Sequence, residues 1–233
     1  MKNIALIIPV YNEASYLPTF LITLASPIKK IPEISNVMFV DDGSTDKTKS
    51  ILESYSKSHN NIVIIKNSTN SGKGYAMRKG LYEAARLQLD AVIFMDGDGQ
   101  HDPSYLPIFI RELKESPVVF GYRKLDEKMP IVRRLGNHIA YFIIHHIFRI
   151  HRYGDILCGY LGIRNDVYDR IRFRSDDYGV EAEISAIVGR CKIPFSEVEV
   201  STIYLDQTKG VNIWHALQIL LRIPMWNIVH GKE

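Results

Sequence analysis

The sequence predicts an α/β domain built around a mainly parallel sheet. In the first half of the chain, short apolar runs alternate with segments of helical apolar spacing, the pattern of strands joined by crossover helices. The chain has 233 residues, which is enough for one full hydrophobic core. It contains no internal repeat, low-complexity tract or clear linker, so we expect a single domain over residues 1–233.

Four strands and three helices are expected before Pro103, and the pattern is mixed after it. Each predicted strand is a buried apolar run that ends at polar or glycine residues. The predicted strands are Ile4–Val10, Val37–Val40, Ile62–Ile65 and Ala91–Met95. The predicted helices are Ser15–Ala25, Lys47–Ser58 and Tyr75–Gln88, with Ser44, Thr45 or Asp46 as caps of the second.

Composition excludes some classes of function and indicates a compartment. A formal net charge of +3 is too small to indicate nucleic-acid binding. Two cysteines, Cys158 and Cys191, form neither a disulfide framework nor a zinc-ligand spacing, which favours a reducing compartment. There is no cleavable signal pattern and no run of ~18 apolar residues. We therefore expect a cytoplasmic protein, either free or peripheral on the cytoplasmic face of a membrane.

Acidic residues follow three of the predicted strands. Because ligands of parallel α/β sheets bind outside the carboxyl ends of the strands, these acids are expected on one rim. Asp96 and Asp98 are two residues apart, so in extended backbone their side chains leave the same face. Two close carboxylates repel unless a cation lies between them, and oxygen ligands suit Mg²⁺ or Mn²⁺. The alternative for this motif alone is an ordinary acidic turn.

Two further groups on the rim suggest nucleotide binding. Asp41 and Asp42 are placed to accept hydrogen bonds from ribose hydroxyls or a base edge, although helix capping is an equally simple role. Glu13 has the same two interpretations. Lys73 stands between two glycines before a predicted helix, where free backbone N–H groups can bind phosphate. No Walker or Gly-x-Gly-x-x-Gly pattern is present, which disfavours a dinucleotide oxidoreductase.

Four ordered motifs resemble those of family 2 glycosyltransferases of the GT-A fold. They are Ile8–Glu13, Val40–Asp46, Asn70–Gly74 and Met95–His101. The later segments resemble the branch that acts on polyprenyl phosphates, such as the dolichyl-phosphate mannose and glucose synthases. These segments are Gly121–Arg123, Asp155–Tyr160, and Glu197–Tyr204 with Thr208 and Lys209. The resemblance implies a GT-A fold, with nucleotide-sugar binding by residues 1–120 and acceptor binding by residues 121–233.

The resemblance also implies the partners and the roles of single residues. It implies a GDP- or UDP-hexose donor, a polyprenyl (dolichyl or undecaprenyl) phosphate acceptor, and Mg²⁺ or Mn²⁺ held by Asp98 and Gln100. The implied donor-binding residues are Pro9, Tyr11, Glu13, Asp41, Asp42, Lys73, Asp96 and Gly97. The implied catalytic residues are Asp98, Gln100, Asp155, Arg123 and Lys209. The implied acceptor-phosphate residues are Arg133, Arg134 and Asn137.

The expected reaction is a single displacement at the anomeric carbon, with inversion. A phosphate acceptor is already ionised near neutral pH and needs positive charge rather than a general base. The alternative is a family 2 enzyme that acts on a hydroxyl of a saccharide, lipid or glycan, which needs a carboxylate base. Asp155, Glu181 and Glu183 are the candidates for that base. A nucleotidyltransferase and a non-catalytic nucleotide-sugar binder are more distant alternatives.

Two apolar stretches edged by basic residues have the composition of amphipathic helices. They are Ile139–Ile150 and Val211–Val229. Such helices can lie in the interface of a membrane. The alternatives are contact with a membrane-protein partner, a homodimer interface, or simple coverage of the sheet.

Overall fold

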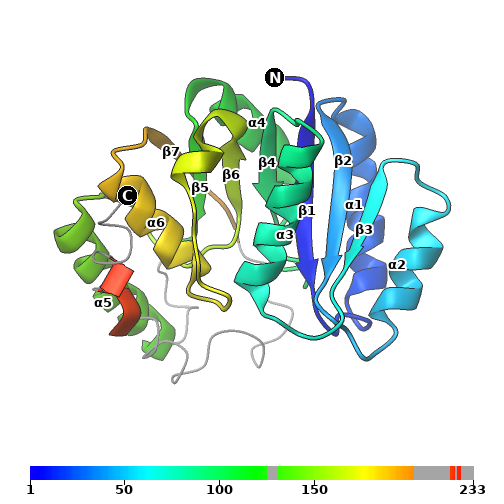
Figure 1. Ribbon diagram of the computed structural model, residues 1–233, viewed down its shortest axis with the longest axis horizontal. Helices are drawn as coiled ribbons and strands as arrows, with labels where there is room; N and C mark the ends of the chain where they lie inside the picture. The colour runs from blue at the N-terminus through cyan, green and yellow to red at the C-terminus, as the bar shows by residue number, and fades with distance from the viewer. Residues whose placement is uncertain (125–130, 202–220, 224, 227–233) are drawn as a thin grey trace.

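The computed structural model describes residues 1–124, 131–201, 221–223, 225 and 226, with the side chains of 131–133 left aside. It contains one sheet of seven strands in the order β3-β2-β1-β4-β6-β5-β7, with helices on both faces (Figure 1). The strands are β1 Ile4–Val10, β2 Ile34–Asp41, β3 Ile62–Lys66, β4 Ala91–Phe94, β5 Val118–Tyr122, β6 Leu161–Arg164 and β7 Phe195–Glu199. The helices are α1 Leu17–Lys30, α2 Thr48–Ser56, α3 Lys73–Arg86, α4 Leu106–Glu115, α5 Ile131–Phe148 and α6 Val180–Arg190.

The prediction of a mainly parallel sheet is confirmed. β1 pairs in parallel with both β2 and β4, β2 with β3, and β5 with β7. The exception is β6, which is antiparallel to both of its neighbours, β4 and β5. The second strand begins at Ile34, three residues before the predicted start at Val37. The prediction missed these residues because the polar pair Ser35 and Asn36 interrupts the apolar pattern of the strand.

The core has two layers, one on each face of the sheet. The layer that contains α3, α5 and α6 receives Ala5 and Ile7 of β1, whereas the layer that contains α1, α2 and α4 receives Leu6 and Ile8. A central parallel strand buried on both faces is apolar at nearly every position, which is why β1 was visible as a continuous run. Burial of one such Ile side chain stabilises the fold by about 1.5–3 kcal/mol.

Helix α5 is amphipathic, as expected for the first of the two stretches. It buries Ala140, Ile144 and Phe148 against the core and leaves Leu135 and Phe142 about 60% exposed. Of the second stretch, the described part is helical at residues 221–223 and 225–226, and the rest lies outside the described residues. Within the described part of the chain, no helix is long and apolar enough to cross a bilayer.

Candidate active site

The carboxyl ends of β1, β2 and β4 lead into a pocket of about 250 Å³ at the lower edge of the sheet in Figure 1. Its wall is formed by the ends of these strands and the residues after them, by the 70–76 segment at the start of α3, and by two residues before α6. The lining residues are Pro9, Val10, Tyr11, Glu13, Asp42, Asn70, Gly72, Lys73, Ala76, Asp96, Gly97, Asp98, Asp177 and Tyr178. The expected rim is therefore present, and three acidic clusters do converge on it.

Asp96 is held by an ion pair inside this pocket. Lys73 Nζ lies 2.6 Å from Asp96 Oδ1. Burial alone would raise the pKa of this carboxyl, but the adjacent Lys73 ammonium outweighs burial and lowers the pKa to about 2. Asp96 is therefore ionised at neutral pH and already has a counter-charge.

Lys73 is shared between two carboxylates, and the second is Glu181 of α6. Lys73 Nζ also lies 2.6 Å from Glu181 Oε1. Burial opposes the charged form of Lys73, but Asp96 and Glu181 together raise its pKa. The pKa of Glu181 is raised, mainly because the group is buried, and Lys73 offsets only part of that shift. One ammonium group therefore connects the strand-end motif to the second half of the chain.

The segment that resembles an acceptor loop passes close to this ion pair. A Cβ atom at Gly159 would lie 2.6 Å from Lys73 Nζ and 2.7 Å from Asp96 Oδ2. A Cβ atom there would have to displace the ends of the Lys73 and Asp96 side chains, so glycine is the residue that leaves this ion pair undisturbed. The backbone before β6 is thus in contact with the charged floor of the pocket.

Asp98 has a different environment from Asp96. It accepts hydrogen bonds from the backbone N–H of Gln100 at 2.9 Å and from Gln100 Nε2 at 2.8 Å. Burial, and secondly the nearby charge of Asp96, raise the pKa of Asp98. Among the described residues, no Lys or Arg forms an ion pair with it. This carboxylate, partly buried beside another, is suited to a divalent cation.

The residues fit a metal that is bound jointly with substrate. No cluster of three or more His, Cys, Asp or Glu side chains suited to a metal occurs in the described ranges. Asp98 and Gln100 are the oxygen-bearing side chains that this motif could offer a metal, and a metal held there would need further oxygen ligands from a bound phosphate group. Mg²⁺ is commonly bound in this way, through one or two carboxylates and substrate phosphates.

The two adjacent acids at the end of β2 have different tasks. Asp42 lines the pocket, and its carboxylate accepts hydrogen bonds from Asn67 Nδ2 at 2.6 Å and from the Gly72 backbone N–H at 2.6 Å. Asp41 is buried outside the pocket lining and accepts from the Ser44 backbone N–H at 3.0 Å. Asp41 therefore supports the turn after β2, whereas Asp42 both holds the 67–72 loop and lines the pocket.

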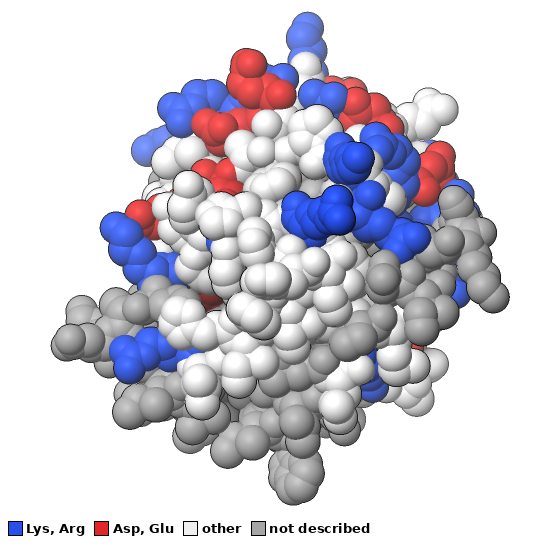
Figure 2. Space-filling view, turned by 90° about the vertical axis from the view of Figure 1, so that its left-hand side faces the viewer, with Lys and Arg blue, Asp and Glu red and all other residues white. Residues whose placement is uncertain are grey.

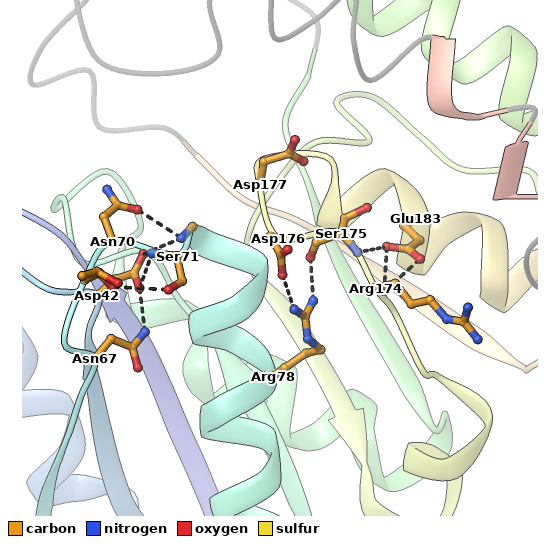
Figure 3. Close-up of polar contacts among 12 residues, drawn as sticks. Asp42, Asn67, Asn70, Ser71, Arg78, Arg174, Ser175, Asp176, Asp177 and Glu183 are labelled. Atoms are coloured by element: carbon orange, nitrogen blue, oxygen red, sulfur yellow. Dashed lines mark hydrogen bonds and ion pairs between the residues drawn. The ribbon is translucent and has the colours of Figure 1, made fainter.

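The prediction that the N-terminus of α3 offers free amides to phosphate is wrong. The Ser71 and Gly72 N–H groups donate to the Asp42 carboxylate (Figure 3). The Gly74 and Tyr75 N–H groups donate to the Asp176 carbonyl at 2.8 and 3.4 Å. The glycines permit the close approach of another chain segment instead of a ligand. A Cβ at Gly74 would lie only 2.0 Å from the Ser175 carbonyl oxygen.

Behind the pocket, His101 connects Asp96 to Arg123. The Asp96 N–H donates to His101 Nδ1 at 3.1 Å, so the neutral ring carries its proton on Nε2. Arg123 Nη2 lies 3.3 Å from that Nε2, and because both groups are donors, Arg123 packs beside the ring without a hydrogen bond to it in this tautomer. Burial is the main cause that lowers the pKa of His101, to about 3. Arg123 Nε lies 4.0 Å from Asp155 Oδ2. Arg123 and Asp155 are therefore supporting groups beside the pocket and not part of its lining.

The structure brings together most of the predicted donor-binding residues. Those in the pocket lining are Pro9, Tyr11, Glu13, Asp42, Lys73, Asp96 and Gly97, together with Asp98. Gln100 contacts the pocket through Asp98. On α5, Arg134 is partly exposed and Asn137 is buried. The Arg133 side chain and all of Lys209 lie outside the described residues.

Sequence reasoning missed four residues of this region. Asn70 and His101 stand inside recognised motifs, and only their spatial neighbours reveal what they contact. Asp177 and Tyr178 belong to an irregular segment before α6, far from any parallel strand end, and no periodic signal marks them. They come from the half of the chain for which the resemblance implies acceptor binding.

Comparisons with known proteins agree with this geometry. The sequence model of glycosyl transferase family 2 matches residues 5–172. A UDP-N-acetylglucosamine–dolichyl-phosphate N-acetylglucosaminyltransferase of Methanococcus voltae is 28% identical over 255 residues, covering 96% of both chains. A dolichyl-phosphate β-glucosyltransferase of Trichomonas vaginalis is 25% identical over 222 residues, covering 88% of this chain and 67% of that protein.

The fold is also that of solved GT-A structures. A glucosyl-3-phosphoglycerate synthase of Mycobacterium tuberculosis, solved with Mn²⁺, UDP and phosphoglyceric acid, superposes with a TM-score of 0.74. Its sequence is 15% identical, and the match covers 99% of this chain and 79% of that one. The likeness establishes the fold, and the family match over more than half of the chain establishes the kinship. The protein is therefore a GT-A glycosyltransferase that belongs to glycosyl transferase family 2.

Proposed function

We propose that the protein transfers a hexose from a GDP- or UDP-sugar to a polyprenyl phosphate, with inversion and with the help of Mg²⁺ or Mn²⁺. The pairing of Asp96 with Lys73, next to an Asp98 that has no such partner among the described residues, carries the proposal. A site with one neutralised and one uncompensated carboxylate suits a metal–diphosphate complex. The acceptor class is supported by relatives whose names specify dolichyl phosphate.

Asp98 and Gln100 would hold the metal, which stabilises the negative charge that develops on the departing diphosphate. The chain itself orients the donor between the strand ends and Tyr178. Lys73 holds the Asp96 carboxylate in one position. Because Lys73 is itself paired with Glu181, this arrangement exists before substrate binds. Such preorganisation means that little reorientation is needed during the reaction.

The three candidate general bases are each engaged in other contacts, which favours a phosphate acceptor over a hydroxyl acceptor. Glu181 is paired with Lys73, and Asp155 accepts from the Leu157 N–H at 2.9 Å beside Arg123. Glu183 accepts from the Arg174 and Ser175 N–H groups, the latter at 2.7 Å. A phosphate acceptor needs no base, and so it makes no demand on these carboxylates.

A transfer assay tests this function. The purified protein is incubated with UDP-glucose, UDP-N-acetylglucosamine or GDP-mannose, with Mn²⁺ or Mg²⁺, and with a short polyprenyl phosphate or the corresponding alcohol. We expect labelled sugar to enter the organic phase with one donor, only with metal and only with the phosphate. Transfer to the alcohol or to a saccharide, with none to the phosphate, would contradict the proposal.

We further propose that α5 lies against a lipid surface, where such an acceptor resides. The helix contains no Asp or Glu, and Leu135, Ile139 and Phe142 are exposed along one side of it. Seen from the α5 side of the molecule, uncharged residues cover the middle of the face, and charged residues of both signs lie along its upper edge (Figure 2). An apolar stripe on a helix without acids suits an anionic bilayer.

Vesicle binding tests this orientation. The variant Leu135→Glu/Phe142→Glu is expected to lose most of the wild-type co-sedimentation with anionic liposomes at low salt, because two charges replace the apolar stripe. Ile22→Glu is the matched control, since Ile22 is 77% exposed on α1 at the opposite face of the sheet. Equal binding by the α5 variant and the wild type would argue against membrane contact at α5, and a wild-type dimer in solution would favour the homodimer.

A further inference from the structure

We propose that Arg78 is a positioning residue that holds Tyr178 in the wall of the donor pocket. The inference rests on the proposed function only in assuming that the pocket binds a nucleotide sugar. Arg78 itself does not line the pocket, whereas Tyr178 does. The connection between them is the irregular segment 173–178, which runs across the N-terminus of α3 (Figure 3).

Arg78 holds this segment at three points. Its Nη1 donates to the Ser175 carbonyl at 2.8 Å, and its Nη2 forms an ion pair with the Asp176 carboxylate. Its guanidinium also lies 5.8 Å from the centre of the Phe173 ring. A planar guanidinium can satisfy a carbonyl and a carboxylate at once, which a lysine ammonium at this position cannot match in geometry.

The rest of the segment is fixed from other directions. The Glu183 carboxylate accepts from the Arg174 and Ser175 N–H groups (Figure 3), and the Asp176 carbonyl accepts from the Gly74 N–H at 2.8 Å. At its far end, Asp177 Oδ2 pairs with Arg222 Nη1 at 2.6 Å. Arg78 supplies the contacts to the middle of the segment from the outer side of α3.

Tyr178 is well placed to contact a donor. Its side chain is 43% exposed, lines the pocket and lies within electrostatic range of Lys73, Asp96 and Glu13. It therefore faces the space between Glu13, for which nucleoside binding is expected, and the aspartate motif. Because α3 carries both Lys73 and Arg78, the helix fixes the charged floor and the tyrosine wall relative to each other.

Loss of Arg78 would remove a hydrogen-bond donor from Ser175 and the cation from Asp176, three and two residues before Tyr178. The segment would then spend only part of its time in the binding conformation. The apparent dissociation constant rises in inverse proportion to the competent fraction. We expect about tenfold weaker nucleotide binding, which corresponds to a competent fraction of about one tenth. KM for the sugar donor rises with it, and kcat changes little.

The experiment is calorimetric titration of the full chain with UDP and with GDP, each with Mn²⁺. Arg78→Ala should weaken binding about tenfold, with Arg78→Lys in between because it retains one ionic contact. Arg86→Ala is the matched control, since Arg86 lies on the same helix and forms its ion pair with Glu83 of that helix, not with the 173–178 segment. It should bind as the wild type does.

A double-mutant cycle separates positioning from general damage. If Arg78 acts through Tyr178, then Arg78→Ala should have little further effect on affinity in a Tyr178→Ala background. Full additivity, or an Arg78→Ala affinity equal to that of Arg86→Ala, overturns the inference while the proposed function stands. A wild-type protein that binds neither UDP nor GDP overturns both.

Discussion

Asp98→Asn is expected to lower metal-dependent sugar transfer by about 1000-fold while leaving the protein folded. The substitution removes the charge that would hold the metal but preserves the shape of the side chain and its contact with Gln100. A metal that stabilises a leaving diphosphate contributes several kcal/mol to the transition state, and about 4 kcal/mol corresponds to a factor of 1000. Steady-state kinetics with Mn²⁺ measures the effect.

The same variant should not lose stability. Burial and the charge of Asp96 raise the pKa of Asp98, so its ionised form is disfavoured in the folded state. A neutral amide removes that unfavourable charge, and the free energy of unfolding in urea should stay equal or rise. Asp169→Asn, at a side chain that is 94% exposed, is the control for a simple change of net charge. Full activity of Asp98→Asn would refute the assignment of Asp98 as a metal ligand.

Lys73→Met is expected to destabilise the fold by about 3–5 kcal/mol, the usual cost of removing one partner from a buried ion pair. The ammonium lies 2.6 Å from both Asp96 Oδ1 and Glu181 Oε1, so its loss leaves two nearby carboxylates without a counter-charge. Urea denaturation in the presence of a chelator measures the change without interference from bound metal.

Removing one of the two carboxylates should lower the stability of the fold less than removing the ammonium group that they share. Glu181→Gln should cost much less than Lys73→Met, because Lys73 keeps its contact with Asp96 and Glu181 is the partner whose pKa is raised by burial. The double variant should recover part of the stability lost in Lys73→Met. A Lys73→Met protein that unfolds at the wild-type urea concentration would show that the pair contributes nothing to the fold.

The parts of the fold that could be predicted are those that local pattern determines. β1 and β4 are buried on both faces, so their apolar runs and the acids that follow them mark both the sheet and the rim. β6 is as short as β4, with four residues, but its apolar run is interrupted by Gly162, which packs against Leu113 of α4, and it ends at Arg164. A short strand of this kind has no distinctive periodicity, and its antiparallel direction depends on the whole chain.

The parts of the site that could not be predicted depend on contacts between distant residues. Gly72 and Gly74 do bracket a helix start, but the Gly72 N–H donates to the Asp42 carboxylate, and the Gly74 N–H donates to the carbonyl of Asp176, about a hundred residues later in the chain. Likewise, Glu183 was a plausible base until its carboxylate was found to accept from the Arg174 and Ser175 N–H groups. In each case the residue type correctly indicated a group that forms hydrogen bonds. In the folded protein, however, that group bonds to another segment of the chain and so holds the fold together.

The direction of β6 has a practical consequence for protein engineering. Phe94, the last residue of β4, pairs with Leu161, the first residue of β6, so the two strands reach the ligand edge by opposite ends. For β4 the residues that follow the strand line the pocket, whereas for β6 it is the residues before the strand that approach it, including Gly159 beside Lys73 and Asp96. A library intended to alter acceptor preference should therefore randomise the stretch before Leu161 rather than the one after Arg164, sparing position 159 itself.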